Sequence, residues 1–168
     1  KFVIRTIDLI DKSFEIAPKI KKDIIVYRMS GRQDLSKLKI GDYFLENNFS
    51  STSLSPSYPF SFYDPDQKYN NYFEIYIPKD NYGLYYNINF SPSKKYFVNE
   101  YEFLLPREST YKVLKKKTIK LKKYTITKYT LLFIGTDFKN NKITKIKQKL
   151  NTKILKKKVD LKFKYYDN

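Results

Sequence analysis

The spacing of hydrophobic residues changes from helical to strand-like near residue 23, and this change predicts a helix followed by strands. In residues 4–17, apolar side chains recur at helical spacing, at Ile4, Ile7, Ile10 and Phe14. The helix is expected to end before Pro18, which cannot continue it. Residues 23–31 (DIIVYRMSG) are rich in β-branched residues and end at a glycine, which predicts a buried strand.

Much of the remaining sequence alternates between polar and apolar positions, with interruptions by proline and glycine. Strands are expected at the start of 47–66, in two parts of 69–88, at 100–105, and two or three times within 109–135. Residues 34–44 predict a short helix or turn, and the rest of 47–66 predicts a loop with three prolines. A helical lead followed by mostly antiparallel strands defines an α+β domain.

Composition limits the classes of protein that the chain can represent. Its 168 residues are 41% hydrophobic, with 17 tyrosines and 13 phenylalanines, which suits one domain with a core and is not a disordered composition. No apolar run approaches the roughly 18 residues of a membrane span, so none is expected. The chain has neither cysteine nor histidine, which excludes thiol nucleophiles, disulfides, Ser-His-Asp triads and ordinary zinc sites. Acid–base chemistry must therefore use carboxylates, tyrosine or lysine, and no metal is implied.

Positive charge is concentrated in the second part of the chain. Residues 1–110 carry 15 basic and 14 acidic side chains, whereas residues 111–168 carry 19 and 3. Such a basic region suggests an acidic partner, which includes nucleic acid, an anionic membrane or an acidic protein. The abundance of Lys, Asn, Ile and Tyr is also what an AT-rich genome produces, so both explanations stay open.

Three short motifs carry the candidate chemistry: VYRMSG (26–31), NFSSTS (48–53) and NEYEFLLP (99–106). Each alone is typical of an ordinary strand end, β-propensity or an exposed strand face. Together and in this order they resemble the mono-ADP-ribosyltransferase family, with its Arg, Ser-Thr-Ser and Glu-x-Glu elements. The resemblance is closest to the catalytic component of actin-modifying clostridial binary toxins and to vegetative insecticidal toxins. It covers roughly residues 7–135, including the connecting segments APKIKKDIIVYRMSG and IYIPKDNYGLYYN.

The resemblance implies NAD as the substrate, and the residues present suit its chemistry. The chain has no Gly-x-Gly-x-x-Gly cradle, so side chains must bind the pyrophosphate. Arg28 matches the family's phosphate-binding arginine, and its guanidinium can contact phosphate through two hydrogen bonds. Glu102 matches the catalytic glutamate, whose carboxylate stabilises the positive charge that develops on the ribose.

A second carboxylate, Glu100, precedes Glu102 by two residues. On one strand the two side chains would lie on the same face. An arginine acceptor is protonated in water, so a carboxylate can orient it and accept its proton. In the family, Glu at this position accompanies arginine targets and Gln accompanies asparagine, so the resemblance implies arginine modification.

Further positions are assigned through the resemblance. Ser51 is expected to hold Glu102 by a hydrogen bond, with Thr52 and Ser53 mainly structural. Asn48 matches a position that contacts NAD in the toxin relatives. Met29 stands where those relatives often have a second basic residue, so the contacts to the nucleotide are expected to be weaker or differently arranged.

Two aromatic positions follow from the same comparison. Phe62 is expected against the nicotinamide, with Phe60 as the competing choice, and both have the alternative role of anchoring a loop. Phe97 falls where the family has an aromatic residue that contacts the target, with Tyr96 as the second choice.

The resemblance predicts an α+β ADP-ribosyltransferase fold of two packed, mainly antiparallel β-sheets with an N-terminal helical lead. An N-terminally short catalytic domain is expected over 1–135, followed by a lysine-rich extension over 136–168 that packs on or continues it. The implied protein is a secreted, monomeric toxin that acts on a target such as actin in the host cytosol, with a separate cell-binding component. Two alternatives stay open: another protein or nucleic-acid acceptor, and a basic nucleic-acid-binding module that does not consume NAD.

Overall fold

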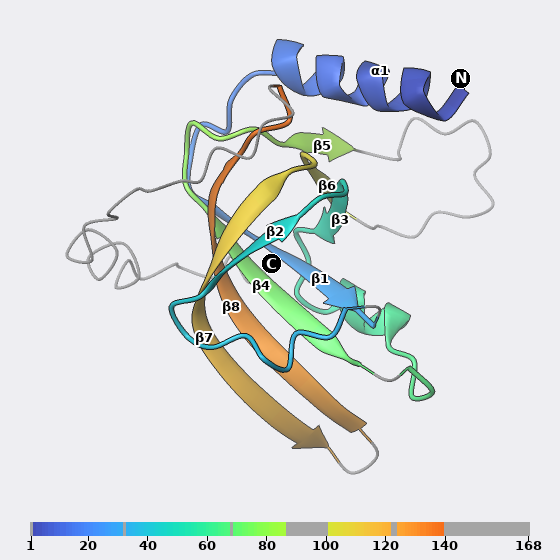
Figure 1. The fold of residues 1–168 in the computed structure, drawn as a ribbon, viewed down its shortest axis with the longest axis vertical. Coiled ribbons are helices and arrows are strands. Elements are labelled where there is room, and N and C mark those ends of the chain that lie inside the picture. The colour runs from blue at the N-terminus through green and yellow to red at the C-terminus, as the bar shows by residue number, and fades with distance from the viewer. Residues whose placement is uncertain (1, 32, 68, 87–100, 122–123, 140–168) are drawn as a thin grey trace.

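A computed structural model describes residues 2–31, 33–67, 69–86, 101–121 and 124–139. The predicted α+β class is confirmed: one N-terminal helix precedes eight strands and a short 3-10 helix (Figure 1). These elements are α1 (Phe2–Ile16), β1 (Ile24–Ser30), β2 (Tyr43–Glu46), β3 (Ser50–Ser53), η1 (Tyr58–Phe62), β4 (Asn71–Ile77), β5 (Leu84–Tyr86), β6 (Glu102–Leu105), β7 (Ser109–Leu121) and β8 (Tyr124–Thr136).

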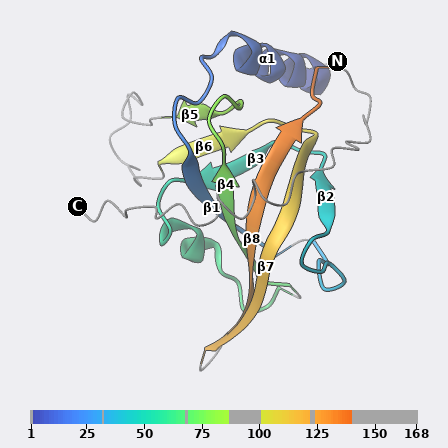
Figure 2. The same cartoon turned by 90° about the vertical axis from the view of Figure 1, so that its left-hand side faces the viewer.

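The strands form one sheet in the order β2-β7-β8-β4-β1-β3-β6-β5, and α1 lies across one end of them (Figures 1 and 2). Neighbours are antiparallel except β4 and β8, which are parallel. Strands β1 and β3 pair only through Tyr27 and Ser53, whereas β1 and β4 pair over seven residues from Ile24 to Ser30. The two expected sheets are therefore two parts of one sheet, a five-stranded part (β2-β7-β8-β4-β1) and a three-stranded part (β3-β6-β5). They meet at the junction where β1 pairs with β3.

The core fills one face of the five-stranded part and continues onto β6. Alternate residues of the central strands point into it, as strand geometry requires. It contains Val26, Phe73, Ile75, Ile77, Phe103, Leu105, Tyr111, Val113, Tyr129, Leu131 and Phe133. Gly83 permits close packing beside this core, because a Cβ atom there would lie 2.3 Å from the Phe103 ring.

Helix α1 ends at Ile16, before Pro18, and its helical pattern is confirmed. Phe14 is fully buried and packs on Phe49 and Phe138, with ring centroids 6.1 and 5.9 Å away. Phe138 lies beyond residue 135, so the first residues of the predicted extension pack on the rest of the domain. Residues 140–168 lie outside the described residues.

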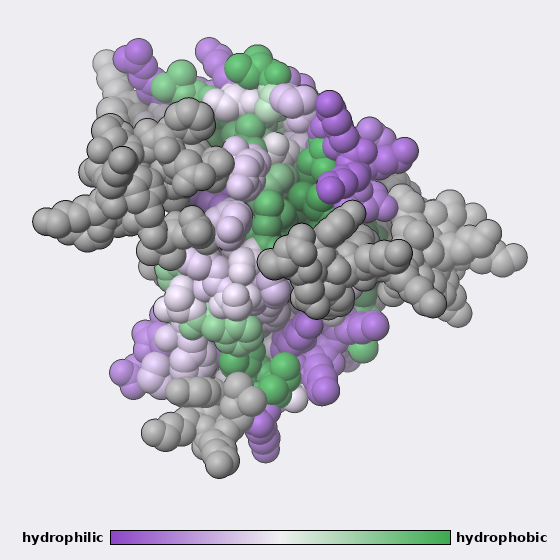
Figure 3. Space-filling view, turned by 180° about the vertical axis from the view of Figure 1, so that it is seen from behind, coloured by the Kyte–Doolittle hydropathy of each residue, from purple (hydrophilic) through white to green (hydrophobic). Residues whose placement is uncertain are grey.

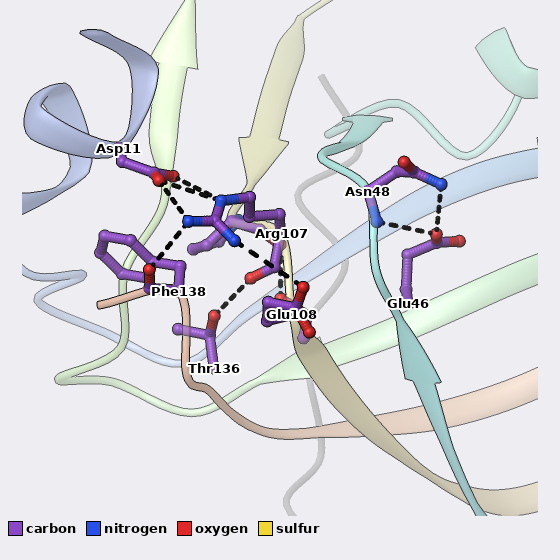
Figure 4. A network of polar contacts seen from close by, with 9 residues as sticks. Asp11, Glu46, Asn48, Arg107, Glu108, Thr136 and Phe138 are labelled. Carbon is purple, nitrogen blue, oxygen red and sulfur yellow. Dashed lines mark hydrogen bonds and ion pairs between the residues drawn. The ribbon is translucent and has the colours of Figure 1, made fainter. Parts of the chain in front are cut away.

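Arg107 connects α1 to the strands (Figure 4). Its Nη2 lies 2.7 Å from Asp11 Oδ2 and also donates to the Phe138 carbonyl at 3.1 Å. Its own carbonyl accepts a 2.6 Å hydrogen bond from Thr136 Oγ1. The hydrogen bonds to Asp11 raise the pKa of Arg107. One side chain thus joins the helix, the β6–β7 turn and the end of β8.

Three details differ from the expected elements or refine them. Residues 58–62 form the 3-10 helix η1 within the predicted loop, with a proline in its first turn. Residues 109–136 form two long strands, the lower of the two numbers expected. Strand β6 begins at Glu102, two residues later than predicted, and Tyr101 before it has a φ of 45°. In the described part of the chain, no helix is both long and apolar enough to cross a membrane.

Candidate active site

The candidate site lies where the two parts of the sheet meet. Tyr27 on β1 pairs with Ser53 on β3, and Ser53 pairs with Glu102 on β6. This register places the Arg motif, the Ser-Thr-Ser motif and the second glutamate on three consecutive strands. Segments more than 70 residues apart in sequence are therefore neighbours at the junction.

Ser51 and Glu102 form the central contact of the site. Ser51 Oγ donates a hydrogen bond of 2.6 Å to Glu102 Oε1. The two residues are diagonal neighbours on the β3–β6 pair, because Ser51 is opposite Leu104 and Glu102 is opposite Ser53. Hydrogen bonds to an ionised carboxylate are short and strong, so this one fixes the direction of the Glu102 side chain.

The other two residues of the Ser-Thr-Ser motif are buried and support the strand. Thr52 Oγ1 donates a short hydrogen bond to the Phe103 carbonyl, which fastens β3 to β6. Ser53 Oγ accepts a 3.0 Å hydrogen bond from the Ser55 backbone N–H, at the start of the following loop. These contacts give Thr52 and Ser53 structural roles.

A pocket of ≈ 230 Å³ lies beside this contact and brings both charged candidates together. It is lined by Tyr27, Arg28, Met29, Ser51, Thr52, Ser53, Tyr58, Pro59, Phe62 and Glu102. Arg28 is a hydrogen-bond donor for an anion, and Glu102 offers a carboxylate to a developing cation. The pocket therefore has complementary groups for a ligand that carries a phosphate and a cationic ring.

The structure separates the two candidate phenylalanines. Phe62 lines the pocket, remains 60% exposed, and meets Tyr58 edge-on with a centroid distance of 5.4 Å. Phe60 does not line this pocket and instead stacks on Tyr72 at 4.9 Å. Phe62 is thus placed to contact a ligand, whereas Phe60 anchors η1 on the sheet.

Asn48 lies before β3 but is not among the residues that line the pocket. Its backbone N–H and its Nδ2 both donate to Glu46 Oε1, at 3.2 and 3.3 Å (Figure 4). Glu46 is buried, and its other oxygen accepts from Gln33 Nε2 at 2.8 Å. Asn48 is exposed, and these contacts use neither its Oδ1 nor the second hydrogen of Nδ2, so its contact with NAD stays a prediction.

Glu100, Phe97 and Tyr96 lie outside the described residues. The argument that placed Glu100 on the same strand face as Glu102 required a continuous strand through residue 101. Tyr101 instead has a left-handed backbone conformation, in which the alternation of strand side chains does not hold. The strand predicted over 100–105 therefore does not include residue 101, and the common face of Glu100 and Glu102 stays a prediction.

Tyr111 lies in the core, where it interacts electrostatically with Arg28. Burial raises the pKa of Tyr111 to about 12, while nearby Ser50 and Ser109 and the charge of Arg28 act in the opposite direction. Among the described residues, the Tyr111 hydroxyl has no hydrogen-bond partner of suitable geometry. In the described part of the chain, it is the one buried polar side-chain atom without a hydrogen-bond partner.

Three pocket residues were not found from the sequence: Tyr27, Tyr58 and Pro59. Tyr27 directly precedes Arg28 in the sequence. Tyr58 precedes Phe62 by four residues, so a predicted helical turn over 58–62 would have indicated that Tyr58 lies beside Phe62. No group of three or more potential metal ligands occurs within the described ranges.

The fold and the order of the three motifs define the class of ADP-ribosyltransferases, and the comparison of the sequence with known families agrees. The ADP-ribosyltransferase exoenzyme family matches residues 1–162, and the chain belongs to this family. Comparison with curated proteins finds no match.

Solved structures of ADP-ribosyltransferase toxins share the fold. Plx2a from Paenibacillus larvae is 24% identical with a TM-score of 0.59, over 78% of this chain and 70% of that one. C2-I, the enzymatic component of the C2-toxin from Clostridium botulinum, is 22% identical with a TM-score of 0.56, over 76% of this chain and 35% of that one. Exoenzyme S from Pseudomonas aeruginosa, solved with human 14-3-3 protein beta and carba-NAD, is 17% identical with a TM-score of 0.56, over 92% and 65%.

Proposed function

We propose that this protein is a toxin-type enzyme that transfers ADP-ribose from NAD to an arginine of a target protein. The observation that carries this proposal is the 2.6 Å hydrogen bond from Ser51 to Glu102 in a pocket shared with Arg28 and Phe62. Membership of the ADP-ribosyltransferase exoenzyme family supports it.

The pocket residues suit two parts of NAD, the pyrophosphate and the nicotinamide. Arg28 would bind the pyrophosphate through its guanidinium fork. Phe62, with its exposed ring, would face the cationic nicotinamide, a contact worth roughly 0.5–2 kcal/mol. Because Met29 carries no charge, Arg28 supplies the only cationic side chain among the residues that line the described pocket.

In the proposed reaction the bond between ribose C1′ and the nicotinamide nitrogen breaks, and its electron pair leaves with nicotinamide. Glu102, oriented by Ser51, stabilises the positive charge that develops on the ribose. A guanidinium nitrogen of the target forms the new bond to C1′ and loses one proton. We assign acceptance of that proton to Glu100, which would also orient the acceptor.

Arginine is the proposed acceptor because the motif has Glu at its first position. The structural relative Vis from Vibrio splendidus, 21% identical, has been solved, and an ADP-ribosyltransferase Vis structure contains agmatine, a small molecule with the same guanidinium group. Actin is the first target to test, because the motifs resemble those of actin-modifying binary toxins. The proposal has five further parts. We propose that the protein is secreted, acts in the host cytosol, is carried by a separate cell-binding component, is a monomer, and contacts its target through Phe97.

The test uses NAD labelled in its adenylate part, with purified actin, a cell lysate and agmatine as acceptors. The wild type is expected to label a single actin-sized band and to release nicotinamide, whereas Glu102→Gln should do neither. Labelling of other proteins would keep the enzyme and change the target. Absence of both label and nicotinamide release would overturn the proposed function.

The role of Glu100 has its own measurement. Glu100→Gln is expected to retain NAD hydrolysis and to lose transfer to agmatine and protein, because only the acceptor step uses Glu100 in the proposal. Undiminished transfer by this variant would show that the acceptor is oriented by another group.

A further inference from the structure

A second pocket, which shares no lining residue with the candidate active site, has no role in the proposed reaction. Its volume is ≈ 550 Å³, within the range of roughly 300–1,000 Å³ that is typical of small-molecule sites. Phe103 lines it and directly follows Glu102 on β6, so the pocket and the Glu102 side chain lie on opposite faces of that strand. We call this pocket the rear groove. It is lined by Ala17, Pro18, Ile20, Lys21, Lys22, Ile24, Leu54, Gly83, Leu84, Tyr85 and Phe103.

Backbone hydrogen bonds hold the walls of the rear groove. The Ile20 N–H donates to the Asn81 carbonyl at 3.0 Å, and the Asp80 N–H donates to the Ile20 carbonyl at 2.8 Å. These two bonds attach the α1–β1 connection to the segment before β5. The Leu54 N–H donates to the Tyr101 carbonyl at 3.0 Å, which holds Leu54 beside the start of β6. The groove is therefore formed by segments that are fixed to one another before any ligand binds.

The rear groove has an apolar floor and an apolar mouth. Phe103, which is 6% exposed, is the one buried side chain among the lining residues and forms the floor. Leu54 and Tyr85 are 38% and 51% exposed and lie at the mouth. The α1–β1 connection and β5 lie on the same side of the molecule (Figure 2), and from behind, hydrophobic side chains gather in its upper half beside a hydrophilic group (Figure 3). Exposed apolar surface in a concave place is typical of a binding site.

Positive charge is confined to one wall of the rear groove. Lys21 and Lys22 are the only charged residues among those that line it, both are exposed, and both belong to the α1–β1 connection. Apart from these two lysines, Tyr85 is the only described lining residue with a polar atom in its side chain. A ligand that complements the groove therefore has a long apolar part and an anionic group at one end.

We infer that the rear groove binds a free long-chain fatty acid, with the alkyl chain against Phe103 and the carboxylate at Lys21 and Lys22. A cavity of about 150 Å³ already holds benzene. A groove of ≈ 550 Å³ has room for a longer apolar chain. Each methylene that leaves water contributes to binding through the hydrophobic effect. Both lysines are exposed, so the carboxylate they bind stays at the edge of the groove in contact with water.

Other classes of ligand fit this lining less well. A peptide would bring backbone N–H and C=O groups against apolar walls that offer them no hydrogen bonds, and sugars would bring hydroxyl groups with the same difficulty. A membrane phospholipid would gain little by moving an acyl chain into the groove, because the bilayer interior is equally apolar. A free fatty acid has one chain and one charge, and each has a counterpart in the lining.

The test measures how palmitate, kept below its micelle concentration, displaces the fluorescent fatty acid cis-parinaric acid from the full chain. Leu54→Glu places a carboxylate at the mouth of the groove, and Lys21→Gln removes one of its two cations. The matched controls are Ile40→Glu and Lys37→Gln, at an exposed apolar residue and an exposed lysine that do not line the groove. Circular dichroism checks that each variant is folded.

The wild type is expected to bind one palmitate per chain. Leu54→Glu should weaken binding by about 10-fold or more, because its carboxylate repels that of the ligand and removes apolar contact. Lys21→Gln should weaken palmitate binding by about two- to fivefold, the effect of an exposed ion pair, and leave binding of the uncharged hexadecanol unchanged. Myristate, which is two methylenes shorter, should bind about 4- to 15-fold more weakly than palmitate. Both controls should match the wild type.

Absence of displacement by palmitate, or equal losses in the groove variants and their controls, would overturn the inference. So would equal effects of Lys21→Gln on palmitate and hexadecanol, since the lysine would then not bind the carboxylate. Tighter binding of phosphatidylserine vesicles, or self-association of the chain that Leu54→Glu abolishes, would assign the groove to a membrane or to a second copy instead. The inference does not rest on the proposed function, because binding is measured without NAD: absence of nicotinamide release by the wild type would remove the enzyme and leave the fatty-acid result unchanged.

Discussion

At the scale of single residues, Glu102 depends on one hydrogen bond for its direction. Its carboxylate lies at the beginning of β6, directly after a residue with a left-handed backbone conformation. The Ser51 hydroxyl is the group that the structure places on it, at 2.6 Å. A carboxylate that stabilises developing charge must be held in position before the reaction, because reorientation during the reaction costs free energy.

Ser51→Ala is therefore expected to lower kcat for nicotinamide release by about 10- to 100-fold, since small misplacements of a reacting group cost this much. KM for NAD and the melting temperature should change little, because Ser51 is exposed. Initial rates over a range of NAD concentrations separate the two constants. Ser55→Ala, which removes a hydroxyl from an exposed 3.1 Å contact with Ser57, is the control. A change confined to KM would show that Ser51 binds NAD instead of positioning Glu102.

The two phenylalanines of η1 are expected to give different phenotypes. Phe62→Ala should raise KM for NAD by about 2- to 30-fold, the equivalent of a cation–π contact of roughly 0.5–2 kcal/mol. Phe60→Ala should instead lower the free energy of unfolding, because it removes the stack on Tyr72. Urea titration together with steady-state kinetics distinguishes the two effects. A larger KM effect for Phe60→Ala would exchange the assigned roles.

At the scale of elements, α1 is attached to the strands mainly through Phe14 and the Asp11–Arg107 pair. Val3, Ile4, Leu9 and Ile16 of the helix are exposed, so apolar burial alone supports it weakly. Arg107 and Asp11 are 16% and 14% exposed, and removal of one partner from such a pair leaves a poorly solvated charge.

Arg107→Met is expected to lower the free energy of unfolding by about 1–3 kcal/mol, less than for a fully buried pair. Arg5→Met, at an exposed position of the same helix, should change it by no more than about 0.5 kcal/mol. Urea unfolding monitored by circular dichroism measures both. Equal effects would mean that the ion pair does not hold α1 in place.

The elements that could be predicted from sequence were those with a strong local pattern. The helix over 4–17 and the strands over 23–31 and 69–77 follow from spacing and from proline or glycine at their ends. The 3-10 helix η1 was missed because its proline and aromatic residues are equally typical of a loop. The parallel pairing of β4 with β8 and the contact of Phe138 with Phe14 were also missed, because both join distant segments without a local signal.

For the residues of the candidate site, too, only those with a local sequence signal could be predicted. Arg28, Ser51 and Glu102 were found because their motifs have a fixed order, and their proximity depends on the register of three strands. Glu46 was missed, since nothing in its local sequence indicates that it is buried and accepts hydrogen bonds from Asn48. Buried polar groups of this kind are specified by packing rather than by local sequence.

At the scale of the whole molecule, the pocket and the core meet at β1. Arg28 lines the pocket and also interacts electrostatically with Tyr111 in the core. A hydroxyl that is fully buried without a hydrogen bond costs roughly 1–3 kcal/mol. The core therefore contains a polar group that lowers its stability, close to the residues that carry the proposed chemistry.

The buried Tyr111 hydroxyl leads to a prediction of how the free energy of unfolding changes in alkaline solution. Burial raises the pKa of Tyr111 from 10.0 in the unfolded chain to about 12 in the folded protein. Above pH 10 the unfolded chain loses the proton first, so the contribution of Tyr111 is complete below pH 10 and is lost as pH rises through about 12. Between pH 10 and about pH 12, the free energy of unfolding of the wild type should fall by about 2 kcal/mol relative to that of Tyr111→Phe. At neutral pH that variant should be at least as stable as the wild type, because no hydrogen bond is removed. Urea titrations at several pH values measure both, with Tyr85→Phe, at a half-exposed position, as the control. A variant that follows the wild type at every pH would show that the Tyr111 hydroxyl is solvated in the folded protein.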